Sequence, residues 1–178
     1  MSIGSTFVYL QKIAANLLFP IECIACGKEG NWLCGTCITH VPYWTNRVCP
    51  YCFTSSPTGI YCSTCKKTSA LERLWIVLPY RFPTVHDLIH TLKYQGATSL
   101  SATLHVLMES SLKEYRRRVS SVAEIVIPIP LHARRQRERG FNQADILAQI
   151  SASCLNTRYA PRILQRVRKT ESQALLSR

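Results

Sequence analysis

No stretch of this 178-residue chain is apolar over the length that a transmembrane helix requires. The N-terminus is apolar, but no basic segment precedes its apolar residues and no small-residue cleavage site follows them, which argues against a secretory signal peptide. Acidic residues are scarce, with 10 Asp and Glu against 22 Lys and Arg, and no low-complexity linker interrupts the chain. We therefore expect a cytoplasmic protein without a membrane span.

Positive charge is concentrated in the C-terminal part of the chain. Residues 1–65 contain three Lys and Arg against two Glu, whereas residues 66–178 contain nineteen against eight acidic residues. Apolar residues make up 47% of the chain and charged residues 18%, which is typical of a globular protein with a packed core. The basic surplus predicts an anionic partner, either nucleic acid or a phosphorylated small molecule, and does not choose between them.

Eight of the nine cysteines fall in four C-x-x-C pairs. Two residues between thiolates allow both sulfurs to face one ion, and two such pairs complete a tetrahedron around zinc. The spacing predicts two closed, structural zinc sites in a reducing compartment, and not the disulfide framework of a secreted protein. The predicted ligand pairs are Cys23/Cys26, Cys34/Cys37, Cys49/Cys52 and Cys62/Cys65.

The sequence leaves open which two cysteine pairs bind the same ion. We expect neighbouring pairs in the sequence to share an ion, although an interleaved arrangement also fits the spacing. Iron–sulfur ligation and redox dithiols are the alternatives to zinc. His40 lies three residues after Cys37 and could replace a cysteine, but eight cysteines make that unnecessary. Because the segment has few large apolar residues, metal binding should supply most of its folding free energy.

The chain divides into three predicted regions. Residues 1–20 predict an amphipathic helix that ends at Pro20, residues 21–68 form the cysteine-rich segment, and residues 69–178 have the pattern of an α/β domain. The helix needs an apolar surface to cover its face, and packing on its own chain is a simpler explanation than membrane attachment because its polar face carries one cation.

Hydrophobic periodicity predicts the first elements of the α/β domain. Residues 74–80 predict a strand, and Thr84 with Asp87 predicts a capping box for a helix that Gly96 closes. A second helix is predicted over residues 99–115, followed by three arginines that suit the negative end of the helix dipole. These elements are typical of an α/β fold.

A strand, a cationic loop and a helix start follow one another between residues 124 and 150. The β-branched run 125–129 ends at prolines, and Asn142 begins a helix that buries Leu147 and Ile150. Guanidinium groups and free N–H groups beyond the end of a strand form a cradle for an anion, and a solvated basic turn is the alternative. The predicted loop contains Arg134, Arg135, Arg137 and Arg139.

Three motifs suggest a relative. They are P-x-P-L-H-x-R-R-x-R-x-R-G-F-N-Q-A at residues 128–144, L-K-Y-x-G at 92–96 and R-x-R-x-T-x-x-Q-x-x-L at 166–176. Together with the cysteine pairs, they resemble the ComF family of competence-associated, phosphoribosyltransferase-like proteins, which includes ComFC-type proteins of DNA uptake. The resemblance covers essentially the whole chain. It implies a partial phosphoribosyltransferase-like parallel sheet with flanking helices, preceded by a small double zinc ribbon.

The resemblance also implies a ligand. In the type I phosphoribosyltransferase fold, phosphoribosyl pyrophosphate and magnesium sit at the carboxyl ends of parallel strands. Lys93 and Tyr94 match the family's L-K-Y segment, which does not decide whether they contact a ligand. The alternative role for the arginine-rich segment is to pin the loop to the sheet. The residues implied to bind phosphate are Arg135, Arg139, Asn142 and Gln143.

The sequence departs from the family after the T-x-x-Q segment. Members continue into paired aspartates and a T-T-G-x-T loop that hold the ribose and the 5′-phosphate, whereas this sequence reaches Arg178 first. Asp87 and Asp145 are its only aspartates, and neither adjoins another acid. We therefore expect a C-terminally truncated member with no catalytic residues and no transferase activity, in which magnesium binds only if the complete site exists.

Two alternatives belong to other functional classes. One is a single-stranded DNA-binding module, with aromatic residues of the ribbon beside the basic α/β part, although each metallated Cys₄ site adds a formal charge of about −2. The other is a scaffold that docks a protein of the DNA-uptake machinery through the N-terminal helix and the ribbon. The aromatic residues of the first alternative are Trp32, Tyr43, Trp44, Tyr51 and Phe53.

Overall fold

The computed structural model describes residues 20–43, 48–56, 59–94, 98–119, 122–168 and 170. The helix predicted for residues 1–20 lies outside these residues except for Pro20. Within the described part of the chain, none of the helices combines the length and the apolar character needed to cross a membrane.

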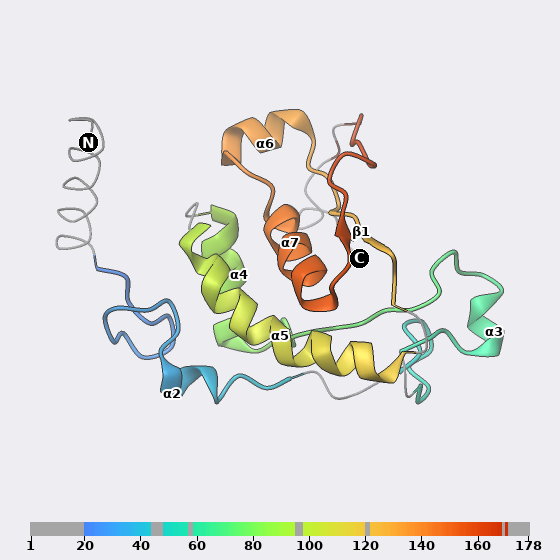
Figure 1. The fold of residues 1–178 in the computed structure, drawn as a ribbon, viewed down its shortest axis with the longest axis horizontal. Helices are drawn as coiled ribbons and strands as arrows, with labels where there is room; N and C mark the ends of the chain where they lie inside the picture. Colours follow the sequence, from blue (N-terminus) through green and yellow to red (C-terminus); the bar gives the residue numbers. More distant parts are fainter. Residues whose placement is uncertain are drawn as a thin grey trace.

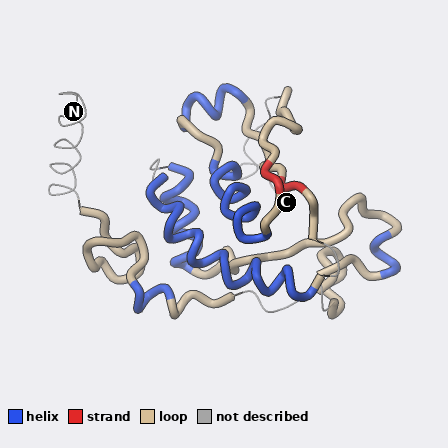
Figure 2. The backbone as a smooth tube through the Cα atoms, in the orientation of Figure 1, coloured by secondary structure: helices blue, strands red, loops and turns tan. Residues whose placement is uncertain are grey.

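Helices make up most of the regular structure, and long segments without helix or strand connect several of them (Figures 1 and 2). The two cysteine-rich segments lie toward opposite sides of the molecule, and the long helix α5 runs between them (Figure 1). The elements in chain order are α2 (Gly35–Ile38), α3 (Ser63–Lys66), α4 (Pro83–Tyr94), the 3₁₀ helix η1 (Thr98–Leu100), α5 (Ser101–Arg118), β1 (Ile125–Val126), α6 (Ala133–Arg139), α7 (Gln143–Leu155) and β2 (Arg158–Tyr159).

The described strands form one two-stranded parallel sheet. Ile125 lies opposite Arg158 and Val126 opposite Tyr159, and α6 and α7 make the crossover that a parallel pair requires. The sequence predicted β1 but assigned residues 156–162 to a simple connection, so β2 was missed. Of the predicted parallel sheet with flanking helices, the structure confirms the mixture of helices with a small parallel sheet.

The hydrophobic core lies where α4, α5 and α7 meet the first cysteine-rich segment. The apolar stripes predicted for α4 and α5 face it, because residues three and four apart share one side of a helix. The contact between α5 and α7 is the most extensive one between elements. The most deeply buried leucines are Leu88, Leu92, Leu100, Leu104 and Leu107.

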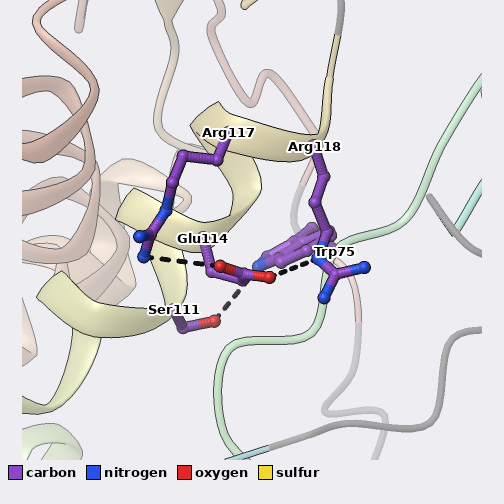
Figure 3. Close-up of polar contacts among 5 residues, drawn as sticks. All are labelled: Trp75, Ser111, Glu114, Arg117 and Arg118. Atoms are coloured by element: carbon purple, nitrogen blue, oxygen red, sulfur yellow. Dashed lines mark hydrogen bonds and ion pairs between the residues drawn. The ribbon is translucent and has the colours of Figure 1, made fainter.

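The strand predicted for residues 74–80 is wrong. These residues form no strand in the structure, where Val77 and Leu78 pack against the core and Trp75 contacts α5. The Trp75 indole Nε1 donates to Ser111 Oγ at 3.1 Å (Figure 3). The Trp75 ring also meets the Tyr115 ring edge-on, with 5.0 Å between ring centres. The same view shows Arg117 and Arg118 paired with Glu114, at the end of α5 that was predicted to be basic.

The capping box predicted at Thr84 and Asp87 is also wrong. Helix α4 begins at Pro83, which places Thr84 inside its first turn. Proline is suited to that first position, since its fixed φ is helical and it lacks an N–H that would have no partner there. Asp87 accepts a hydrogen bond from His86 Nδ1 at 2.9 Å, and the predicted closing residue Gly96 lies outside the described residues.

The cationic loop predicted after β1 is largely helix α6. His132 caps it, with its Nδ1 accepting from the Arg134 backbone N–H at 3.3 Å, and Gly140 closes it with a left-handed φ of 82°. Inside the helix, Arg134 Nε pairs with Glu138 one turn later at 2.9 Å. This pairing and the two caps explain why a run of arginines forms a helix. The helix start predicted at Asn142 is confirmed, because Asn142 Oδ1 accepts from the Ala144 N–H.

Candidate functional site

Two groups of four cysteines stand out in the described residues. In each group, all four sulfur atoms lie within 4.8 Å of one another. The structure thus brings together pairs that are neighbours in the sequence. The first group contains Cys23, Cys26, Cys34 and Cys37, and the second contains Cys49, Cys52, Cys62 and Cys65.

Both groups are built from the same local structures. The first pair of each lies on a tight turn, closed by a hydrogen bond from the Gly27 N–H to Cys23 O in one group and from the Phe53 N–H to Cys49 O in the other. Gly27 and Phe53 both adopt a positive φ, of 75° and 62°. The second pair of each starts a one-turn helix, α2 after Cys34 and α3 after Cys62.

Equivalent backbone donors also point at equivalent sulfurs. The N–H of Cys34 faces the Cys23 sulfur at 3.4 Å, and the N–H of Cys62 faces the Cys49 sulfur at 3.5 Å. These contacts connect the two halves of each group and favour a thiolate, since an N–H group stabilises nearby negative charge. Each group is therefore arranged for anionic sulfur ligands.

The sulfur spacing fits a tetrahedral metal ion. Four sulfurs at about 2.3 Å from zinc lie about 3.8 Å apart along each edge of the tetrahedron. The distance between Cys26 and Cys34 sulfurs is 3.7 Å, and that between Cys52 and Cys62 sulfurs is also 3.7 Å. Two Cys₄ sites of this geometry are consistent with two zinc ions and have no open coordination position, which is typical of structural sites.

The thiols of each group differ in acidity in the same way. Burial of Cys23 opposes its ionisation. Hydrogen bonds from the backbone of Cys34, Ala25 and Cys26 outweigh that effect and lower the pKa of Cys23 to about 6. A backbone hydrogen bond from Cys52 is the main reason that the pKa of Cys49 falls to about 6. In contrast, the hydrogen bond with Cys34 raises the pKa of Cys37 to about 12, and burial raises that of Cys65 to about 12. Four thiolates need a bound cation to coexist.

A separate cavity of about 300 Å³ lies between the end of α4 and helix α6. It is lined by Lys93, Tyr94, Arg135, Glu138 and Arg139. Two of the four residues implied to bind phosphate, Arg135 and Arg139, are therefore together in one cavity with the lysine and tyrosine of the L-K-Y segment. Three cations converge there against one carboxylate, so the cavity favours an anionic ligand.

Arg139 is held in place by two contacts. Its Nη1 donates to Gln143 Oε1 at 2.6 Å, and its guanidinium carbon lies 5.3 Å from the centre of the Tyr94 ring. The arginine thus bridges α6, α7 and α4. Gln143, the third of the four residues, serves here as the anchor of Arg139 and does not line the cavity.

Asn142 lies elsewhere. Its Oδ1 caps α7, and its Nδ2 donates to Ile129 O at 3.0 Å, which ties the loop to the residues after β1. It borders a different cavity of about 400 Å³ formed by residues after β1 and β2, including Arg162 and Arg166. The structure therefore brings three of the four residues together and places Asn142 apart.

Sequence reasoning missed two partners of the arginines. Glu138 lines the cavity and pairs with Arg134, a relationship that the four-residue spacing could have revealed. A neighbouring cavity of about 190 Å³ joins Arg134 and Arg135 with Arg166. Arg135 borders both cavities, and no sequence pattern connects Arg166 with α6.

The aromatic residues of the ribbon that the structure describes differ in their exposure. Trp32 is half-buried and donates its Nε1 to Ser99 Oγ at 2.9 Å, and the Tyr43 hydroxyl reaches Ser110 on α5. Tyr51 and Phe53 are 72% and 73% exposed on the second cysteine group, and Trp44 lies outside the described residues. Of the four described residues, Trp32 thus packs against the core, whereas Tyr43, Tyr51 and Phe53 are exposed.

Comparison with known proteins gives one family model for the N-terminal part of the chain and individual relatives over most of its length. The family model of the double zinc ribbon domain matches residues 14–66. DNA utilization protein YhgH of Escherichia coli O6:H1 is 30% identical over 83% of this chain and 66% of its own length. The protein of the same name in Salmonella typhi is 31% identical over 82% of this chain and 64% of its length.

Competence protein F of Haemophilus influenzae is 29% identical over 89% of this chain and 71% of its own length. The chain thus spans about two thirds of the length of the curated relatives that it matches. No solved structure matches the chain.

Proposed function

The chain belongs to the ComF family of DNA utilization and competence proteins, and from that premise we propose that it binds a phosphorylated ligand, phosphoribosyl pyrophosphate or a related sugar phosphate, in the cavity between α4 and α6. The observation that carries this proposal is the convergence of Lys93, Arg135 and Arg139 on one cavity of about 300 Å³. In the same proposal, each Cys₄ group holds one structural zinc ion.

The side chains of the cavity suit a phosphate group. Arginine presents a planar fork of donors that matches two phosphate oxygens, and lysine adds a compact charge. Because Gln143 and Tyr94 already orient Arg139, less conformational entropy is lost when a ligand binds. The Glu138 carboxylate repels an anionic ligand, and a magnesium ion bound to that ligand would offset the repulsion. The lining therefore agrees with a phosphate ligand that binds together with magnesium.

Calorimetric titration of phosphoribosyl pyrophosphate with magnesium into the zinc-loaded protein tests this proposal. The wild type should give a saturable heat, and Arg139→Gln should weaken binding about tenfold or more because a charge-assisted hydrogen bond is lost. Arg137→Gln is the matched control, since Arg137 lies exposed on the same helix and lines none of the three cavities.

The outcomes separate clearly. A saturable heat that Arg139→Gln weakens and Arg137→Gln leaves unchanged supports the cavity as the site. Absence of heat from the wild type, or equal losses in both variants, contradicts it. A metal count on the same sample tests the zinc assignment and should find two zinc ions for each chain, as two Cys₄ groups require.

A further inference from the structure

Two histidines lie one turn apart on an exposed face of helix α4. His86 and His90 are four positions apart in the sequence, which places them above one another on the helix. Both are exposed, and the buried face of α4 is formed by other residues, among them Leu88 and Leu92. The centres of the two imidazole rings are 6.1 Å apart, and the ring planes differ by 21°. The pair therefore faces solvent and not the hydrophobic core.

The spacing of this histidine pair is that of a helical metal site. Two histidines four residues apart on one face of a helix can direct one nitrogen each at the same zinc ion, as in the H-E-x-x-H motif. Residues 86–90 read H-D-L-I-H, with an acidic residue at the second position. Among the described residues, no third histidine, cysteine, aspartate or glutamate completes a group of ligands with the pair. The pair thus has the helical part of such a site without its third protein ligand.

A hydrogen bond orients the first ring of the pair. His86 Nδ1 lies 2.9 Å from Asp87 Oδ1. A neutral imidazole that donates its Nδ1–H to this carboxylate has its lone pair on Nε2, where a metal ion can bind. Metal-binding histidines usually donate their second nitrogen in this way, which fixes the tautomer and makes the ligand more basic. Asp87 also places a negative charge beside the pair, which favours a cation.

A small movement of the rings brings both nitrogens to one ion. A nitrogen about 2.1 Å from the ion places its ring centre about 3.2 Å away, so two rings on one ion have centres about 5 Å apart. The observed 6.1 Å is about 1 Å longer than this bound separation. Rotation of two exposed side chains about their torsions supplies that difference without moving the helix backbone.

We propose that His86 and His90 bind an exchangeable divalent transition-metal ion, such as zinc, nickel or copper, with water in the remaining coordination positions. Imidazole nitrogens suit these ions, whereas magnesium and calcium prefer oxygen ligands. Two protein ligands leave coordination positions open, in contrast to the closed Cys₄ groups. The bound ion is therefore accessible to exogenous ligands.

Nearby positive charge limits the affinity of this site. Tyr80 and Tyr94 flank the pair, with ring centres 5.2 Å from that of His86 and 4.5 Å from that of His90. Lys93 Nζ lies 5.7 Å from the Tyr80 ring centre, and the Arg139 guanidinium lies 5.3 Å from that of Tyr94. These cations oppose a metal ion and Asp87 favours it. The ion should therefore bind more weakly here than in either Cys₄ group, and exchange readily.

Calorimetric titration of nickel ions into the zinc-loaded chain, without an affinity tag and free of excess metal, tests this inference. Nickel accepts imidazole ligands, and tetrahedral thiolate sites favour zinc, so both zinc ions should stay bound, as a zinc count after the titration would verify. The wild type should bind one nickel ion for each chain. His90→Ala should weaken that binding about tenfold or more, because one of two protein ligands is lost.

Three further variants separate ligation from other effects. His90→Gln keeps a polar side chain without a ring nitrogen and should lose as much affinity as His90→Ala. Circular dichroism would verify that α4 remains folded in both, since alanine and glutamine favour the helix. His40→Ala is the matched control, because His40 is an exposed histidine with no second histidine one turn away. Asp87→Ala removes the acceptor that orients His86 and should weaken binding less than His90→Ala does.

The outcomes decide the inference independently of the proposed sugar-phosphate site. Binding of one nickel ion with both zinc ions retained, weakened by both His90 variants and unchanged by His40→Ala, supports the histidine pair. Absence of saturable binding to the wild type, equal affinity of His90→Ala, or nickel uptake that releases zinc overturns it. His86 and His90 do not line the cavity between α4 and α6, so His90→Ala should leave the heat of phosphoribosyl pyrophosphate binding unchanged.

Discussion

The two cysteine groups are alike around their sulfurs and different in their surroundings. Both have the same turn, the same one-turn helix and the same N–H to sulfur contact. Among the described residues, the segment around the first group contributes Cys23, Leu33, Cys34 and Val41 to the hydrophobic core, and the segment around the second group contributes none. The first group is thus part of the main core, and the second is held largely by its own contacts.

The difference indicates that two metal sites of the same geometry support different parts of the molecule, one the main core and the other a segment outside it. Trp32 and Tyr43 connect the first group to Ser99 and Ser110 near and on α5. The segment around the second group pairs with the residues that follow it through backbone hydrogen bonds, in which Leu74 donates its N–H to Gly59 O at 3.1 Å and Tyr61 donates its N–H to Glu72 O at 3.2 Å. A Cβ at Gly59 would lie 2.5 Å from Leu74 O, so that junction requires glycine.

The largest expected effect comes from breaking the first metal site. Cys23→Ser removes a buried ligand whose neighbours belong to the core, so we expect one zinc ion to be lost together with the cooperative thermal transition of α4, α5 and α7. Hydrogen exchange of the helix amides would measure the loss of cooperative structure, and a metal count would measure the loss of zinc. A native transition with one zinc ion missing would show that the core does not depend on the first group.

Breaking the second site should have a smaller and more local effect. Cys49→Ser removes an equally buried ligand, yet no described residue of its group belongs to the main core. We expect the loss of one zinc ion and of amide protection in residues 48–68, with helical circular dichroism largely retained. If Cys49→Ser unfolded α5 as Cys23→Ser does, the proposed difference between the groups would be wrong.

The same contrast should hold for apolar side chains. Leu33 is 4% exposed in the core, and Leu33→Ala should lower the free energy of unfolding by about 2–5 kcal/mol. Ile60 lies in the segment around the second group and is 40% exposed, so Ile60→Ala should lower the free energy of unfolding by less than about 1 kcal/mol. Denaturant unfolding of both variants measures the difference, and similar midpoints would contradict it.

The smallest expected effect concerns the turns that follow the first pair of each group. Gly27→Ala forces a Cβ into a positive φ with free space around it, so it should cost about 1 kcal/mol through backbone strain alone. Phe53→Gly relieves that strain at a ring that is 73% exposed, and it should be neutral or stabilising by up to about 1 kcal/mol. Thermal melts of the zinc-loaded variants compare the two. A destabilising Phe53→Gly would indicate that the ring contributes contacts of its own.

The sequence predicted the features that depend on neighbouring residues. The C-x-x-C spacing predicted two Cys₄ sites, and apolar periodicity predicted α4, α5 and α7, with Asn142 as the cap of α7. These features follow from short-range geometry, because a turn or a helical face is set within a few residues.

Features that depend on distant residues were predicted less well. Residues 74–80 have a strand-like composition, but Trp75 finds its partner on α5, 36 residues away. The cavity joins α4 to α6, and although the basic segment suggested an anion site, no periodicity placed Lys93 and Tyr94 of α4 beside Arg135 and Arg139. The sequence predicts a loop where helix α6 forms, because a run of arginines is typical of a solvated basic turn, although the helix has caps at His132 and Gly140.

Each of the eight paired cysteines belongs to one group only, so no sulfur bridges the two. Two metal ions held in this way are electronically isolated from each other. Cobalt replacing zinc should therefore give an absorption spectrum that is the simple sum of two mononuclear tetrahedral centres, and each centre should fill without altering the colour of the other.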